Sequence, residues 1–85
     1  MSIDECMFKL IERLQKIAKL NDDEFLYRID VELLRGGKLK YCFVAEETAD
    51  GHEFASGCGG SIQEAIAETE DGIPAACEYW EYKEM

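Results

Sequence analysis

Cys58 and His52 are the two side chains whose chemistry and position are compatible with a reactive centre. Cys58 lies in the glycine-rich segment 57–61, directly before a predicted helix. The N-terminal end of a helix lowers the pKa of a nearby thiol and makes it more reactive. No other cysteine lies close to Cys58 in the sequence, so we interpret it as a packed or idle thiol. His52 adjoins an Asp50-Gly51 turn signal, and we interpret it as a surface residue.

The spacing of the cysteines argues against a metal centre. Zinc sites usually contain close ligand pairs, whereas this chain has one histidine, no C-x-x-C pair and four scattered cysteines: Cys6, Cys42, Cys58 and Cys77. The glycines do not form a phosphate loop either. We therefore expect no metal, no cofactor, no catalytic residues and no enzymatic activity. The acidic N-terminus has no signal segment, so we expect a cytoplasmic protein with reduced thiols.

Acidic residues dominate the charge of the chain. Nineteen acids and nine bases give a net charge of −10. Residues 61–85 contain seven acids and one base, whereas residues 1–21 contain three acids and four bases. A field of this sign repels nucleic acid and anionic membranes and attracts basic protein surfaces. The same charge also serves solubility alone.

Apolar spacing predicts a helix followed by three strands. A capping box at 2–5 begins a helix with an apolar stripe: Ile3, Met7, Leu10, Leu14 and Ile17. Residues 25–33 alternate as a strand whose inward side chains are Phe25, Tyr27, Ile29, Val31 and Leu33. Arg35-Gly-Gly-Lys38 predicts a hairpin turn. A second strand has the inward set Leu39, Tyr41, Phe43 and Ala45, and a third covers residues 52–57.

A glycine turn then leads into a second helix. We expect Gly57, Gly59 and Gly60 to adopt backbone angles closed to other residues. Ser61 and Glu64 form a second capping box, in which the Glu64 carboxylate returns to the Ser61 N–H. Gly72-Ile-Pro74 interrupts this helix, as a break or as a kink in one bent helix. The predicted fold is one α+β domain over residues 1–85, α-β-β-β-α, with both helices on one face of an antiparallel sheet.

This element order resembles the double-stranded-RNA-binding domain. In that family the last strand leads into a helix through the pattern G-x-G-x-S-K-K-E-A-K. The matching positions are Gly57, Gly59, Ser61, Glu64 and Ala65. The lysines that contact phosphates in that family are replaced here by Ile62, Gln63 and Ile66. The resemblance therefore implies the fold with a degenerate RNA-binding face.

The same segment is similar to the turn of HicB-type antitoxins, in which G-C-x-x-x-G-x-[ST]-x-x-E-A leads into a helix. That resemblance implies a small domain that binds a toxin protein. In size and charge the chain also resembles small acidic phage proteins, among them anti-CRISPR inhibitors. Both likenesses imply a protein partner.

We predict a non-enzymatic protein-interaction module that binds a basic surface on another protein. In its sharper form the module is an inhibitor that occupies a surface built for nucleic acid. The predicted partner-binding residues are Glu68, Glu70, Asp71, Glu78, Tyr79, Trp80, Glu81 and Tyr82. Tyr and Trp are frequent hot-spot residues, although Tyr79 and Trp80 are equally suited to covering the core.

Two alternatives stay open. A nucleic-acid binder would use the bases of the first helix, Lys9, Arg13, Lys16 and Lys19. A homo-oligomeric accessory protein would pair through an apolar patch of Leu26, Cys42 and Val44 on the outer face of the sheet. We expect no membrane contact and either a monomer or a homodimer.

Overall fold

The first helix, α1 (Ile3–Leu20), begins where the sequence predicts. The computed structural model describes residues 2–84. Ser2 caps α1, because its hydroxyl oxygen accepts a hydrogen bond from the Glu5 N–H at 3.2 Å. The helix ends at Asn21, whose N–H donates to carbonyls of the last turn. The predicted stripe is buried in its second half, at Leu10, Leu14 and Ile17, whereas Ile3 is exposed.

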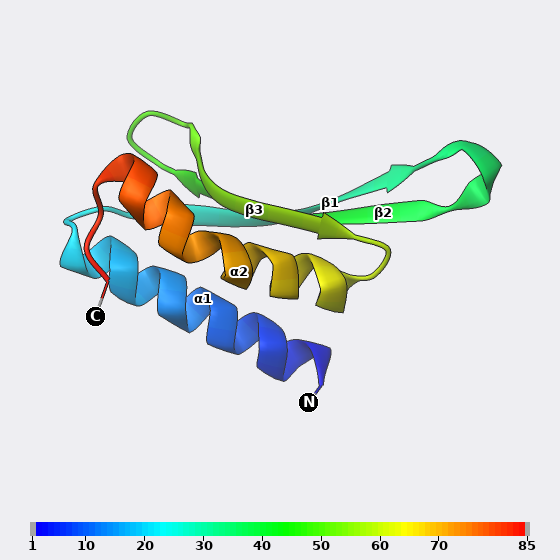
Figure 1. The fold of residues 1–85 in the computed structure, drawn as a ribbon, viewed down its shortest axis with the longest axis horizontal. Helices are drawn as coiled ribbons and strands as arrows, with labels where there is room; N and C mark the ends of the chain where they lie inside the picture. Colours follow the sequence, from blue (N-terminus) through cyan, green and yellow to red (C-terminus); the bar gives the residue numbers. More distant parts are fainter. Residues whose placement is uncertain (1, 85) are drawn as a thin grey trace.

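Three antiparallel strands form one sheet in the order β1-β2-β3. They are β1 (Phe25–Leu33), β2 (Leu39–Glu47) and β3 (Glu53–Gly59). The turn between β1 and β2 contains a short 3-10 segment, η1 (Arg35–Gly37), in which two glycines have positive φ angles. Both helices lie on the same face of the sheet (Figure 1). The predicted α-β-β-β-α fold of the α+β class is therefore confirmed.

The second helix, α2 (Ile62–Trp80), runs without interruption through Pro74. Of the two predicted alternatives, the structure thus has one helix rather than two. Ser61 caps it by accepting from the Glu64 N–H at 3.2 Å. The returning bond of the predicted capping box is wrong, because the Glu64 carboxylate accepts from the Gly60 N–H at 2.8 Å and not from Ser61.

The core lies between the sheet and the two helices. Its largest fully buried side chains are Phe43, Leu10, Leu14, Ile17, Ile73 and Thr69. The Thr69 hydroxyl is satisfied within α2, since it donates to the Ala65 carbonyl at 2.8 Å. Cys77 is buried in this core, and Cys6 packs against it. Both therefore fill apolar space as small hydrophobic side chains.

The predicted role of the glycines before α2 is wrong. None of Gly57, Gly59 and Gly60 has a positive φ angle, and β3 continues to Gly59. Gly57 is needed for a different reason. A Cβ atom at this position would lie 2.4 Å from the Thr69 nitrogen and 2.8 Å from the Ala65 oxygen. The missing side chain therefore lets α2 pack directly against β3.

The far end of the β1–β2 hairpin projects beyond the helices (Figure 1). We call residues 29–41 of this hairpin the arm; it begins beside the core, against which Tyr41 packs, and ends at the exposed turn. The inward set predicted for β1 is consequently wrong in part. Phe25 is buried and Tyr27 is half-buried, but Val31 is 57% exposed and Leu33 is 71% exposed. Leu39, predicted to point inward from β2, is exposed as well.

Candidate functional site

The exposed side of α2 carries four carboxylates in one line, which we call the acidic stripe: Glu64, Glu68, Asp71 and Glu78. At 3.6 residues per turn these positions fall within an arc of about 80°. The helix contains no lysine or arginine. Among residues 2–84, none of the four forms an ion pair with a basic side chain. The stripe is therefore a purely negative surface, of which the sequence predicted Glu68, Asp71 and Glu78.

Two other predicted acids lie away from this line. Glu70 is half-buried on the side of α2 that faces α1, where its charge helps to raise the pKa of Arg13. The larger cause of that shift is the hydrogen bond from Arg13 to Glu84. Glu81 is exposed and ends the helix in a left-handed conformation with φ of 57°. Glu70 and Glu81 therefore do not extend the acidic stripe into one continuous surface.

The predicted aromatic residues differ in their surroundings. Tyr79 is 76% exposed, and its ring contacts Trp80 edge-on with centroids 4.7 Å apart. The Trp80 ring stacks on His52, with ring centroids 4.3 Å apart. Tyr82 stacks on Phe54 at 5.1 Å, and its hydroxyl donates to Asp23 and Glu47. Burial, reinforced by those acceptors, raises the pKa of Tyr82, so it stays protonated as a donor. Trp80 and Tyr82 therefore hold the fold together.

Residues 81–84, the segment that follows α2, are attached to α1. Asn21 exchanges two hydrogen bonds with the backbone of Lys83, each 2.9 Å long. Arg13 donates to both carboxylate oxygens of Glu84, at 2.6 and 2.9 Å. These contacts fix the end of the described chain against the C-terminal half of α1.

Glu47, Asp50 and His52 form a cluster that the sequence analysis did not predict. One ligand atom from each residue lies within 4.8 Å of the others. His52 Nε2 is 3.0 Å from Glu47 Oε2, yet it is buried without an aligned hydrogen bond. One imidazole and two carboxylates can together bind a divalent cation. Alternatively, the contact between His52 and Glu47 is an ion pair when the imidazole carries a proton. The sequence feature that could have predicted this cluster is the presence of three candidate metal ligands within residues 47–52.

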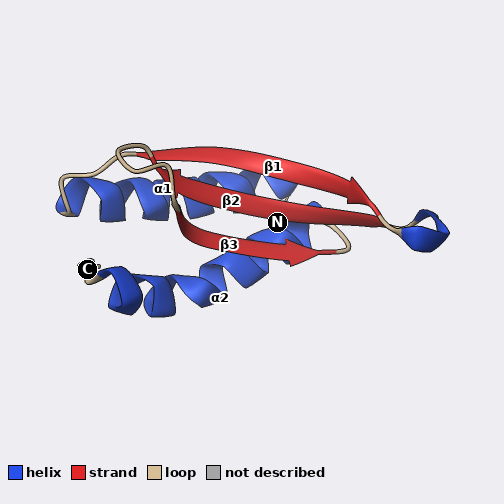
Figure 2. Ribbon diagram, turned by 90° about the horizontal axis from the view of Figure 1, so that it is seen from above, coloured by secondary structure: helices blue, strands red, loops and turns tan. Residues whose placement is uncertain are grey.

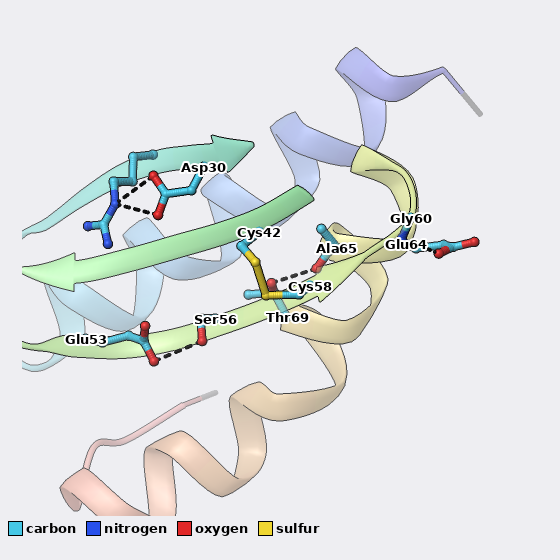
Figure 3. The surroundings of a disulfide bond; sticks show 10 residues. Asp30, Cys42, Glu53, Ser56, Cys58, Gly60, Glu64, Ala65 and Thr69 are labelled. Carbon is cyan, nitrogen blue, oxygen red and sulfur yellow. Dashed lines mark hydrogen bonds and ion pairs between the residues drawn. A yellow bond between two sulfur atoms is a disulfide. The ribbon is translucent and has the colours of Figure 1, made fainter. Parts of the chain in front are cut away.

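Cys42 and Cys58 are joined in a disulfide across β2 and β3 (Figure 3). The expectation of reduced thiols throughout, and of an idle thiol at Cys58, is therefore wrong for this pair. The two cysteines are direct partners in the strand register, and they lie on the face of the sheet away from the helices. Their pairing removes the nucleophile that the sequence analysis had considered.

The apolar patch predicted on that outer face is also wrong. Cys42 belongs to the disulfide and Val44 is only 4% exposed, which leaves Leu26 alone. Exposed apolar side chains gather instead on the arm. Of the ten large apolar residues that are exposed within residues 2–84, five lie there: Ile29, Val31, Leu33, Leu34 and Leu39.

The bases of α1 line an open groove of about 550 Å³ beside Glu84. Arg13, Lys16 and Lys19 contribute to its walls. Two of these bases are already engaged, Arg13 by Glu84 and Lys16 by Glu12 at 3.4 Å. The predicted alternative of a nucleic-acid site on α1 therefore has less free positive charge than its sequence implies.

Neither helix described within residues 2–84 has the length and apolar character needed to cross a bilayer. Comparison of the chain with protein-family models, curated proteins and solved structures gives no match.

Proposed function

We propose that this protein is a non-enzymatic interaction module that binds a basic surface of another protein through the acidic stripe of α2. The observation that carries this proposal is the row of carboxylates that form no ion pair within residues 2–84, on a helix without a lysine or arginine. Such a surface attracts a cationic partner over a distance set by ionic strength, and it speeds association. Tyr79 lies near the end of the stripe and supplies an aromatic contact.

The dimensions of the stripe support the sharper proposal that the partner surface normally holds nucleic acid. Glu64 and Glu78 are fourteen residues apart, which corresponds to about 21 Å along a helix. The phosphates of one strand advance by about 3.4 Å each along the axis of a duplex, so that length corresponds to the axial span of roughly six of them. We propose an inhibitor that mimics this charge, of the kind that phages encode as anti-CRISPR proteins.

The candidate nucleophile does not favour catalysis. Cys58 is held in a disulfide, and His52 is stacked on Trp80 beside Glu47. Binding without chemistry therefore accounts for the arrangement more simply than an enzyme does, and we propose that no cofactor is involved.

A second proposal is a degenerate double-stranded-RNA-binding domain. The element order and the placement of both helices on one face are compatible with that fold. Residues at the start of α2 argue against retained RNA binding, because the family's lysines are absent and Glu64 and Glu68 are exposed there. We rank this function below a protein partner.

We also propose a cytoplasmic location. One observation argues against it: the Cys42–Cys58 bond, because disulfides persist mainly in oxidising compartments. Thiol alkylation and mass spectrometry of protein taken directly from its host would decide this. With the chain alkylated under denaturing conditions, four modified thiols are expected in a reducing cytoplasm, and two, Cys6 and the buried Cys77, where the disulfide persists.

The test of the proposed function is affinity capture from host lysate at low and at moderate salt, with a nuclease-treated sample in parallel. We expect a protein partner that resists nuclease and is released by salt or by added duplex DNA, because DNA competes for the same basic surface. Capture of RNA or DNA that disappears on nuclease treatment would favour the second proposal.

A further inference from the structure

The outer edge of β1 is a free template for another strand. The sheet order places β1 at an edge, paired only with β2. Within residues 2–84, no backbone hydrogen bond outside the sheet ladder involves residues 25–33. The strand is nine residues long and contains no proline. Its protection against pairing is limited to the charged side chains Arg28, Asp30 and Glu32, and a long uncovered edge strand tends to pair with a chain whose charges complement its own.

The same edge carries apolar side chains that are exposed within the described residues 2–84. Val31 and Leu33 alternate in step with Phe25 and Tyr27, which pack in or against the core, so they belong to the helix-bearing face of β1, yet they are 57% and 71% exposed. The helices do not reach the far end of the hairpin (Figure 1). Figure 2 shows α1 beneath the sheet and not beside the edge, so the helix leaves the β1 edge accessible. An incoming strand would therefore gain both backbone hydrogen bonds and apolar contact.

We infer that the strand paired with β1 is β1 of a second copy of this chain, antiparallel and centred on Ile29. Two-fold symmetry requires one residue to lie on the axis opposite its own twin. Ile29 is the midpoint of β1, so this register overlaps all nine residues. The dimer goes beyond the proposed function and does not depend on it.

Charge complementarity selects this register. With Ile29 on the axis, Arg28 lies across from Asp30 of the second copy, and the pair occurs twice. A shift that puts Asp30 on the axis sets two aspartates opposite each other, and a shift to Arg28 does the same with two arginines. Like charges directly opposite destabilise a sheet, whereas opposite charges stabilise it. Arg28 and Asp30 are exposed, as such pairing requires.

The apolar side chains fit the same register. Val31 falls across from Tyr27 of the second copy, and Leu33 across from Phe25. The bare arm of each copy thereby lies beside the helix-covered end of the other. The product is a six-stranded sheet with all four helices on one face, because the two-fold axis stands perpendicular to the sheet.

The test uses two charge variants, Arg28→Asp and Asp30→Arg, and measures mass in solution by sedimentation. We expect a dimer for the unmodified chain and a dissociation constant at least about tenfold higher for each variant alone, since each puts like charges opposite. An equimolar mixture should restore the dimer, because every pair across the axis is then aspartate with arginine. Loss of the ion pairs that Arg28 makes with Asp30 and Glu46 in its own chain cannot produce this rescue.

A cross-link provides a second measurement if a charge variant fails to fold. In Ile29→Cys the two introduced thiols face each other across the axis within disulfide reach. In the control Glu32→Cys they lie far apart. We expect an oxidised dimer from the first variant alone. A monomeric unmodified chain, or a mixture that fails to associate, or equal cross-linking of both variants would overturn the inference.

Discussion

Gly57 marks the closest approach of α2 to the sheet. A methyl group there would overlap backbone atoms of Thr69 and Ala65, which cannot move without shifting the helix. We predict that Gly57→Ala lowers the free energy of unfolding by about 1–3 kcal/mol, the usual cost of overpacking. Urea denaturation measures this difference.

Gly72→Ala is the matched control. Gly72 lies in α2, the helix that packs against Gly57, and a Cβ atom added there would meet nothing within 4 Å. Alanine is a better helix former than glycine by up to about 1 kcal/mol, so this variant should be at least as stable as the original chain. Equal stability of Gly57→Ala and the original chain would show that α2 does not pack this closely.

Glu84 links the pH of the solution to the attachment of the last residues. Hydrogen bonds from Arg13 lower its pKa, with partial burial opposing them. Because the folded pKa lies below the unfolded value of about 4.3, the stabilisation is present above that pH and is lost as pH falls through the folded pKa. Glu84→Gln should cost about 0.5 kcal/mol at neutral pH, since the pair is partly exposed.

The control for this prediction is Glu81→Gln, which removes an exposed carboxylate that forms no ion pair within residues 2–84. Unfolding measured from neutral to acidic pH should show Glu84→Gln and the original chain converging as the pH falls through the lowered, folded-state pKa of Glu84. A difference that is constant across this range would contradict a role for the charge of Glu84.

Single residues show what sequence could and could not predict. The hydroxyl caps at Ser2 and Ser61 were predictable, because the donor lies three residues along the same chain. The Cys42–Cys58 bond was not, because it requires the register of two strands. The cluster around His52 likewise depends on how a turn folds back, which spacing alone does not determine.

At the scale of elements, the disulfide closes the hairpin between β2 and β3. The cysteines are 16 residues apart in sequence. Cross-linking a loop of this length restricts the unfolded chain, so reduction should lower the free energy of unfolding by about 2–3 kcal/mol. Denaturation with and without a reducing agent measures the effect. In the variant lacking Cys42 and Cys58 the reducing agent should have no effect; a persistent effect would assign it to Cys6 or Cys77.

The order of the elements was predictable from apolar periodicity, but the arm was not. Alternation identifies the two faces of β1 and β2 without saying how far the helices extend along them. β3 pairs with β2 only as far as Tyr41, and the chain then turns into α2. In the part of the chain that the structure describes, no helix or third strand covers the hairpin beyond that point, so predicted core residues such as Val31 and Leu33 are exposed to solvent.

At the scale of the whole molecule, the charge is divided between its surfaces. The bases of α1 are partly neutralised by Glu12 and Glu84, whereas the stripe on α2 is unpaired within residues 2–84. The net charge of −10 is therefore distributed unevenly over the surface, with the acidic stripe on α2, which the total composition does not show. In the inferred dimer the two stripes would lie on the same side of the shared sheet, where one extended basic partner can meet both.

The most direct test of the account compares partner capture by two variants with equal changes in net charge. The first reverses the stripe, through Glu68→Lys, Asp71→Lys and Glu78→Lys, and leaves Glu64 to cap its helix. The second reverses three exposed acids elsewhere, Glu12, Glu24 and Glu53. With circular dichroism unchanged in both, we predict that the original chain and the second variant capture the same protein and that the first captures none. Equal capture by both variants would contradict binding through α2.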